Sequence, residues 1–177
     1  MINLWAPWRS EYILGEGEAS GGCIFCVKPA RGQNSFAEEL ILCATADAFV
    51  ILNKYPYNNG HLMVVPHAHV TSPTDLAPPA LDGLWRLAMG ATAALGAALR
   101  PAGINLGMNL GRVAGAGIAE HCHVHLVPRW NGDTNFMPVI GETKVISQHL
   151  VATYRTLLPR FRKLPGVIAS GDEGGPP

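Results

Sequence analysis

The chain has 177 residues, 48% of them hydrophobic and 15% charged, and its 13 basic side chains balance 13 acidic ones. A chain of this length and composition predicts one globular domain with a sizeable core. Because there is no excess of positive charge to neutralise a phosphate backbone, we expect no nucleic-acid polymer as a partner, although a few local groups could hold a small anionic ligand.

Neither a secretory signal nor a membrane span is expected. Met1–Leu14 contains aromatic and charged side chains where a signal peptide has its apolar core. The longest uncharged helical stretch, Leu87–Leu99, is too short to cross a bilayer. We therefore expect a cytoplasmic protein without a membrane partner.

The first half of the chain predicts a cysteine-bearing loop followed by short strands. The segments on either side of Cys23 and Cys26 are polar or rich in glycine, which places this C-x-x-C pair on a loop or turn. In a chain without a signal, that spacing indicates metal or redox chemistry before a disulfide framework. Apolar runs bounded by turn residues then predict three strands, Glu39–Thr45, Ala48–Asn53 and His61–Pro66.

The second half predicts helices on either side of two further strands. Apolar residues at helical spacing, Trp85 among them, predict a helix over Pro78–Leu99. The remaining predicted elements are two strands, Gly103–Asn109 and His121–Val127, a helix over Val145–Leu158, and a flexible tail over 169–177. Hairpin strands with one central helix predict an α+β fold, with an antiparallel sheet of about five strands, a long central helix and a C-terminal helix.

Three histidines alternate in the segment His121-Cys122-His123-Val124-His125. On a β-strand, alternate side chains share one face, so the three imidazoles are expected to lie together. Histidine is suited to acid–base work, nucleophilic attack and metal ligation near neutral pH. An ordinary half-buried strand mixes its polar residue types, so strict alternation predicts a chemical site rather than three structural histidines.

A glycine-rich loop, Gly111–Gly117, directly precedes the histidine row. Its tip lacks bulky side chains, so the backbone N–H groups can approach a ligand closely. Successive N–H groups in such a turn can form an anion-binding nest. A plain connecting loop is the alternative, but beside the histidines a phosphate site is the favoured interpretation.

These motifs resemble the histidine-triad (HIT) family of nucleotide hydrolases and transferases, whose signature is His-φ-His-φ-His-φ-φ, with φ an apolar residue. The resemblance extends from Leu40 to Leu150: Asn53–Pro66 resembles the family's ribose-binding turn and Gly-His strand, and Asn109–Gly117 its phosphate loop. Leu4–Arg9 and Pro128–Phe136 are similar to the branch of diadenosine polyphosphate phosphorylases and hydrolases. The resemblance also implies a homodimer in which two sheets join.

The resemblance implies a role for each site residue. His123, the middle histidine, is the nucleophile that attacks the α-phosphorus and forms a nucleotidyl-histidine intermediate. His125 binds phosphate oxygens or helps the leaving group to depart. Asn53 hydrogen-bonds the ribose. The phosphate and its developing charge are held by Asn109 and the N–H groups of Gly115, Ala116 and Gly117.

Structural alternatives exist for several of these assignments. Asn53 could cap a turn, Asn109 could satisfy backbone groups of the loop, and His61 could orient the sheet instead of contacting a ligand. Gly117 stands where many family members carry a glutamine that contacts phosphate. Backbone contacts are expected to replace that side chain.

The cysteine pair implies a second site. Alone it could be a redox pair or chance, but some family members and the related galactose-1-phosphate uridylyltransferases bind zinc through such a pair and two histidines. The matching residues here are Cys23, Cys26, His69 and His121. Two thiolates and two imidazoles form the closed tetrahedral set of a structural zinc, and the chemistry itself then requires no metal. An empty reduced site and the use of His67 in place of His69 are the alternatives.

The resemblance thus implies a single domain over 1–168 with an N-terminal zinc-binding segment. Its implied activity is nucleotidyl transfer from a dinucleoside polyphosphate, such as diadenosine tetraphosphate, to water or to phosphate, the acceptor being left open. The alternatives are a nucleoside phosphoramidate hydrolase, a nucleotide-binding sensor or interaction protein without turnover, and a purely zinc-organised structural protein. The intact triad favours an enzyme, because binding alone does not require His123.

Overall fold

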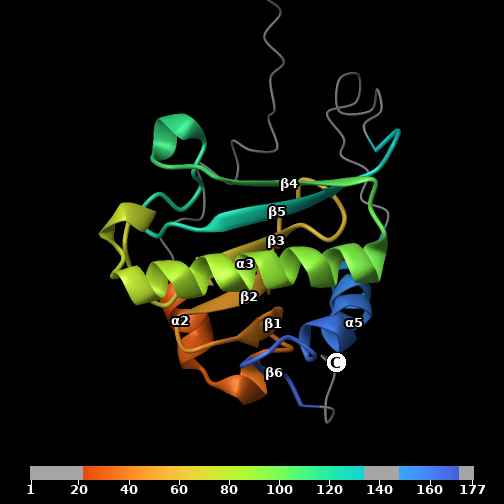
Figure 1. Ribbon diagram of the computed structural model, residues 1–177, viewed down its shortest axis with the longest axis horizontal. Helices are drawn as coiled ribbons and strands as arrows, with labels where there is room; N and C mark the ends of the chain where they lie inside the picture. Colours follow the sequence, from red (N-terminus) through yellow and green to blue (C-terminus); the bar gives the residue numbers. More distant parts are fainter. Residues whose placement is uncertain (1–21, 134–147, 172–177) are drawn as a thin grey trace, which may run out of the picture.

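The computed structural model describes residues 22–133 and 148–171. Its centre is a six-stranded antiparallel sheet in the order β4-β5-β3-β2-β1-β6 (Figure 1). The strands are β1 (Ile41–Ala44), β2 (Ala48–Leu52), β3 (Leu62–Pro66), β4 (Gly103–Met108), β5 (Val124–Arg129) and β6 (Ile168–Ala169). The predicted α+β fold is confirmed, with six strands in place of about five. The Leu4–Arg9 motif and the end of Pro128–Phe136 lie outside the described residues.

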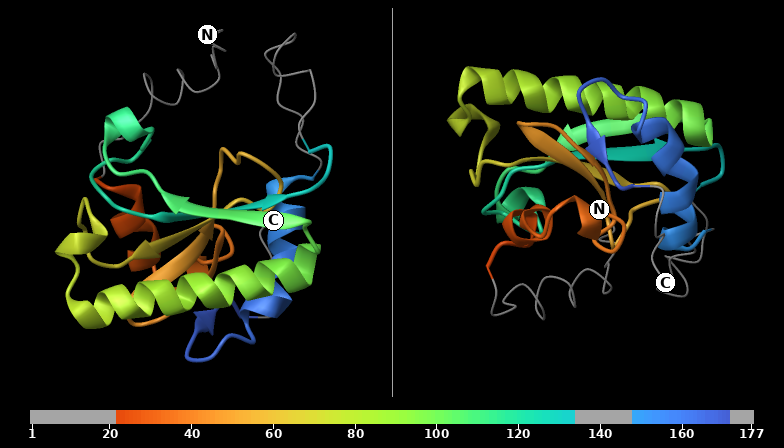
Figure 2. Two further views of the ribbon diagram at one scale, coloured as in Figure 1. Left: turned by 45° about the horizontal axis from the view of Figure 1, so that its top comes forward. Right: turned by 90° about the horizontal axis from the view of Figure 1, so that it is seen from below.

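Helices cover both faces of the sheet. The long helix α3 (Pro78–Leu99) lies across one face, and the short helix α2 (Ile24–Ala30) lies on the opposite face (Figures 1 and 2). α5 (Leu150–Phe161) packs against α3 and the β1 end of the sheet. None of the described helices combines the length and apolar character needed to cross a bilayer.

The central helix has the bounds that the sequence predicts. Proline occupies the first helical position, where its missing N–H costs no hydrogen bond, and the helix ends where Arg100 adopts a left-handed conformation with φ 48°. One expectation for its packed face is wrong: Trp85 is 37% exposed, because the buried stripe runs through Leu84, Leu87, Ala88, Ala91 and Leu95.

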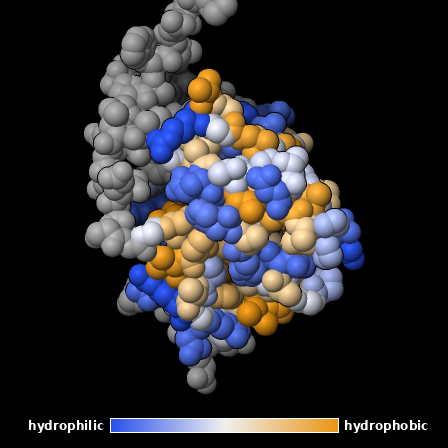
Figure 3. All heavy atoms as spheres, turned by 90° about the vertical axis from the view of Figure 1, so that its left-hand side faces the viewer, coloured by the Kyte–Doolittle hydropathy of each residue, from blue (hydrophilic) through white to orange (hydrophobic). Residues whose placement is uncertain are grey.

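Where Figure 3 shows the described surface, apolar and hydrophilic residues are interspersed.

Two hydrophobic clusters lie on opposite faces of the sheet. Val124 and Leu126 of β5 belong to the cluster beneath α3. Phe25 of α2 packs in the other cluster with Phe49 and Met63. Since side chains alternate along a strand, His125 lies on the α2 face, where it pairs in register with Met63 of β3.

Three sequence-based expectations are corrected by the structure. β5 begins at Val124, so His121 and His123 precede the strand; here the chain turns to Val70, whose carbonyl accepts from the Cys122 N–H at 2.7 Å. Cys23 and Cys26 occupy the start of a helix rather than a loop: Cys23 is the N-cap of α2, and its carbonyl accepts from the Cys26 N–H at 3.0 Å.

The third correction concerns the C-terminal end. The tail predicted from residue 169 does not begin there, because Ala169 pairs with Cys43 as part of β6, and Ser170 is buried. A two-residue strand leaves almost no periodicity in the sequence. The predicted helix over Val145–Leu158 corresponds to α5, which ends three residues later, and 145–147 lie outside the described residues.

Candidate active site and metal centre

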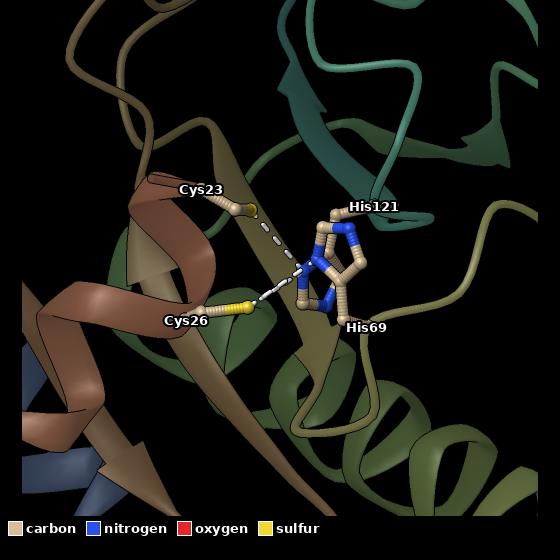
Figure 4. A group of neighbouring side chains, drawn as sticks. All are labelled: Cys23, Cys26, His69 and His121. Atoms are coloured by element: carbon tan, nitrogen blue, oxygen red, sulfur yellow. Dashed lines mark hydrogen bonds between the residues drawn. The ribbon is translucent and has the colours of Figure 1, made fainter. Parts of the chain in front are cut away.

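Four predicted metal ligands converge at one end of the sheet (Figure 4). Cys23 and Cys26 lie on successive turns at the start of α2, His69 follows β3, and His121 precedes β5. Their ligand atoms all lie within 4.8 Å of one another. Segments that are almost a hundred residues apart in the chain are thereby brought to a single point, as the sequence predicts.

The spacing of these atoms matches a tetrahedral metal site. Cys23 Sγ lies 3.4 Å from His121 Nδ1, Cys26 Sγ lies 3.7 Å from the same atom, and Cys26 Sγ lies 3.3 Å from His69 Nδ1. Zn–S bonds of about 2.3 Å and Zn–N bonds of about 2.0 Å at tetrahedral angles place sulfur and nitrogen ligands about 3.5 Å apart. The donor set and its geometry therefore fit zinc.

The protonation of His121 also suits a metal ligand. Its Nε2–H donates to the Pro66 carbonyl at 2.9 Å, which leaves the lone pair of Nδ1 facing the cysteines. Burial lowers the pKa of His121, so the neutral ligand form is favoured. His67 does not take part: its Nε2 bonds to the Thr45 carbonyl at 3.0 Å, and its ring lies against Phe49.

His123 is held in the form that a nucleophile needs. Its Nδ1–H donates to the His121 carbonyl at 2.9 Å, so the lone pair of the neutral ring resides on Nε2. The side chain is only 4% exposed, and this burial lowers the pKa of His123. A neutral imidazole with a lone pair on Nε2 is the nucleophilic form near neutral pH.

His125 is held in the opposite tautomer by a chain of hydrogen bonds. The Tyr57 backbone N–H donates to Nδ1 of His61 at 3.0 Å, so the ring proton of neutral His61 resides on Nε2. That N–H donates to Nδ1 of His125 at 2.9 Å. The proton of neutral His125 is therefore on Nε2. With ring centroids 4.7 Å apart, His123 offers a lone pair and His125 a proton.

The sequence left open whether His61 contacts a ligand or orients the sheet. It is fully buried and bonds to His125, so it orients another histidine. Asn53 supports it: the amide oxygen accepts from the Tyr55 N–H at 2.9 Å, and the amide nitrogen lies 3.4 Å from His61 Nδ1. The turn-capping alternative for Asn53 is thus present in the structure. In the sequence, the contact between these two side chains could have been expected from their positions on either side of one turn.

The glycine loop is closed by its own backbone. Gly111 and Gly115 have φ of 83° and 90°, a region that glycine adopts without strain. The Gly115 N–H donates to the Arg112 carbonyl at 2.9 Å, and the Ala116 N–H donates to the Gly111 carbonyl at 3.3 Å. Among the described residues, no backbone carbonyl accepts a hydrogen bond from the Gly117 N–H, which thus differs from the N–H groups of Gly115 and Ala116.

Asn109 satisfies a backbone group of the loop, which is the structural role given above as the alternative to phosphate binding. Its side-chain amide donates to the Gly115 carbonyl at 3.3 Å and ties the end of β4 to the loop. Asn109 therefore fixes the shape of the loop that follows it. A contact between Asn109 and phosphate stays a prediction.

Comparison with known proteins identifies the class that this geometry represents. The model of the HIT domain matches residues 35–132, and the chain belongs to the HIT family. It is 40% identical over 167 residues to AP-4-A phosphorylase of Mycobacterium tuberculosis, a match that covers 92% of this chain and 85% of that protein. The prediction that the chain is a HIT-family enzyme is confirmed by this similarity.

Solved structures confirm the fold independently. A hypothetical histidine triad nucleotide-binding protein from Sulfolobus tokodaii matches with a TM-score of 0.61 at 23% identity, over 79% of this chain and 92% of that one. A Zn-bound histidine triad family protein from Mycobacterium smegmatis gives the same TM-score of 0.61 and 23% identity, over 82% and 96% of the two chains.

Proposed function

We propose that this protein transfers a nucleotidyl group from a dinucleoside polyphosphate to inorganic phosphate, with His123 as nucleophile. The single observation that carries the proposal is the complementary protonation of His123 and His125, set by the His121 carbonyl and by His61. A binding protein has no need for a lone pair and a proton side by side. The similarity to AP-4-A phosphorylase supports the substrate class and the acceptor.

The proposed reaction proceeds in two displacements. Nε2 of His123 attacks the α-phosphorus and a P–N bond forms. The bond to the bridging oxygen breaks, and the Nε2–H of His125 donates a hydrogen bond to that oxygen as it leaves with its negative charge. With diadenosine tetraphosphate, ATP leaves and AMP remains on His123. An oxygen of hydrogen phosphate then attacks the same phosphorus, the P–N bond breaks and its electron pair returns to Nε2. This yields ADP, whose terminal phosphate carries the proton of the attacking phosphate.

The remaining predicted ligands support this scheme. Asn53 would bind the ribose, while Asn109 and the loop N–H groups of Gly115–Gly117 would hold the phosphate. Of these three N–H groups, that of Gly117 is the best candidate for phosphate binding, because the N–H groups of Gly115 and Ala116 bond within the loop. The chemistry uses no metal in this scheme.

We propose further that zinc occupies the site formed by Cys23, Cys26, His69 and His121. The sulfur–nitrogen distances support it, as does the Zn-bound state of the similar M. smegmatis protein. With all four positions taken by protein atoms, the ion is structural. It would fix the start of α2 against the segments that carry the catalytic histidines.

A homodimer in the cytoplasm completes the proposal. β4 is an edge strand of the described sheet, and most of its residues are exposed. An exposed edge offers unpaired backbone groups to a second copy of the chain. Sedimentation of the purified protein at the mass of one chain would exclude this dimer.

Product analysis tests the function directly. The zinc-loaded protein is incubated with diadenosine tetraphosphate, with and without inorganic phosphate, and the products are separated. We expect ATP and ADP, formed only with phosphate. ATP and AMP without phosphate would make the protein a hydrolase, and tight nucleotide binding without turnover would refute the enzymatic proposal.

A further inference from the structure

Phe25 connects the metal centre with the nucleophile. It lies between the two metal-binding cysteines in Cys23-Ile24-Phe25-Cys26, and its side chain is fully buried. Its position on the first turn of α2 directs the ring toward the sheet, away from the neighbouring Ile24, which is 42% exposed. The segment that supplies two metal ligands therefore also supplies an aromatic ring to the interior.

The Phe25 ring contacts both His121 and His123. Its centroid lies 5.5 Å from the His121 ring at an interplanar angle of 82°, and 5.1 Å from the His123 ring at 57°. The ring of Phe49 in β2 also packs against the Phe25 ring, with the two centroids 6.5 Å apart. These are the separations and edge-to-face geometries at which aromatic rings attract one another.

His123 is thereby constrained by three contacts. The hydrogen bond to the His121 carbonyl holds Nδ1, while the rings of Phe25 and His125 pack against the imidazole at 5.1 and 4.7 Å. A single hydrogen bond leaves an imidazole free to tilt about that bond. Ring contacts restrict the tilt, and the direction of Nε2 depends on it.

We infer that Phe25 is a positioning residue that aims Nε2 of His123 at the phosphorus, so that one short segment serves both the metal and the nucleophile. This inference rests on the proposed role of His123. Phe25 is fully buried in the described structure and has no surface with which to bind substrate. Its loss should therefore lower kcat and leave KM nearly unchanged.

Substitution of Phe25 by leucine tests the inference, with Phe36→Leu as a matched control. Phe36 is a buried phenylalanine of the same hydrophobic cluster, and it has no ring contact with a histidine among the described residues. Misplacement of a reacting atom by about 1 Å can cost about 100-fold in rate. We expect kcat to fall about 10- to 100-fold in Phe25→Leu but less than threefold in Phe36→Leu, with zinc content equal in both.

A second measurement does not depend on turnover. The Nδ1–H proton of His123, held by the His121 carbonyl, should give an NMR signal that exchanges slowly with water, assigned by its absence in His123→Asn. We expect this signal in the parent protein and in Phe36→Leu, and its loss or fast exchange in Phe25→Leu. Phe25→Met provides the same test if the leucine variant does not fold.

Several outcomes would overturn the inference. Equal falls of kcat in the two leucine variants would show a general packing effect, and loss of zinc from Phe25→Leu would show an effect through the metal. Retention by Phe25→Leu of both the parent rate and the His123 signal would also refute it. If the parent protein turns over no dinucleotide, the proposed function fails, and the NMR comparison alone decides the role of Phe25.

Discussion

The Nε2–H of His61 donates to Nδ1 of His125 at 2.9 Å, and this bond determines where His125 carries its proton. The direction is fixed because the Tyr57 N–H occupies the other nitrogen of His61. A backbone amide can only donate. The hydrogen-bond donor to the leaving group in the proposed mechanism is therefore set by a backbone group of the turn that precedes β3.

Loss of this bond should reduce catalysis without preventing binding. In His61→Leu, His125 loses the partner that holds its ring, and we expect kcat to fall about 100-fold with little change in KM. His61→Gln retains an N–H donor of similar reach and should recover part of the rate. His67→Gln, at an exposed histidine outside the site, should keep the parent rate. Equal rates in His61→Leu and His61→Gln would contradict this role.

Replacement of the nucleophile should abolish turnover. We expect His123→Ala to reduce kcat at least about 1,000-fold, because the variant lacks the imidazole whose Nε2 lone pair attacks the phosphorus. Parent enzyme denatured in alkali, where a P–N bond is stable, should carry labelled nucleotide on one peptide, and this label should be absent from the variant. Turnover that survives in His123→Ala would show that the nucleophile is another group.

Metal content provides a test of the ligand set. We expect about one zinc ion per chain in protein purified without chelators, and a large loss of zinc in Cys26→Ser and His69→Ala. Both variants should unfold at a lower temperature, because the ion joins α2 to the segments after β3 and before β5. His67→Ala should retain its zinc. A metal-free parent protein would defeat the four-ligand proposal.

The acid stability of the protein should depend on Asp133. Hydrogen bonds from Arg129 at 2.6 and 2.8 Å lower the pKa of Asp133 from 3.8 to about 2. A carboxyl whose pKa is lowered by folding stabilises the protein above its ordinary pKa, and this stabilisation is lost as the pH falls through the lower value.

Unfolding of Asp133→Asn at a series of pH values measures this contribution. The parent protein should be more stable than the variant by a constant amount above about pH 5. The difference should shrink between pH 4 and 2, the window set by the two pKa values. A difference that is independent of pH over this window would show that the charge of Asp133 is not responsible.

The sequence by itself determined the fold class and indicated the candidate residues of the two sites. The apolar spacing from Leu81 to Leu99 specified the central helix, because a helix buries a stripe of period 3.6 whatever it packs against. The His-φ-His-φ-His pattern and the cysteine pair indicated the two sites. Short elements with weak periodicity, such as α2 and β6, escaped prediction, because tertiary contacts rather than local preference stabilise them.

Only the tertiary structure decided what each histidine can do. Alternation made His121, His123 and His125 equivalent, and the family resemblance gave them roles without a physical cause. The cause lies in hydrogen-bond partners that folding brings into place. The Pro66 carbonyl for His121 and His61 for His125 come from other segments, while His123 bonds to the His121 carbonyl two residues before it. A ring nitrogen carries a proton where its neighbour accepts one, and folding alone determines which neighbour is there.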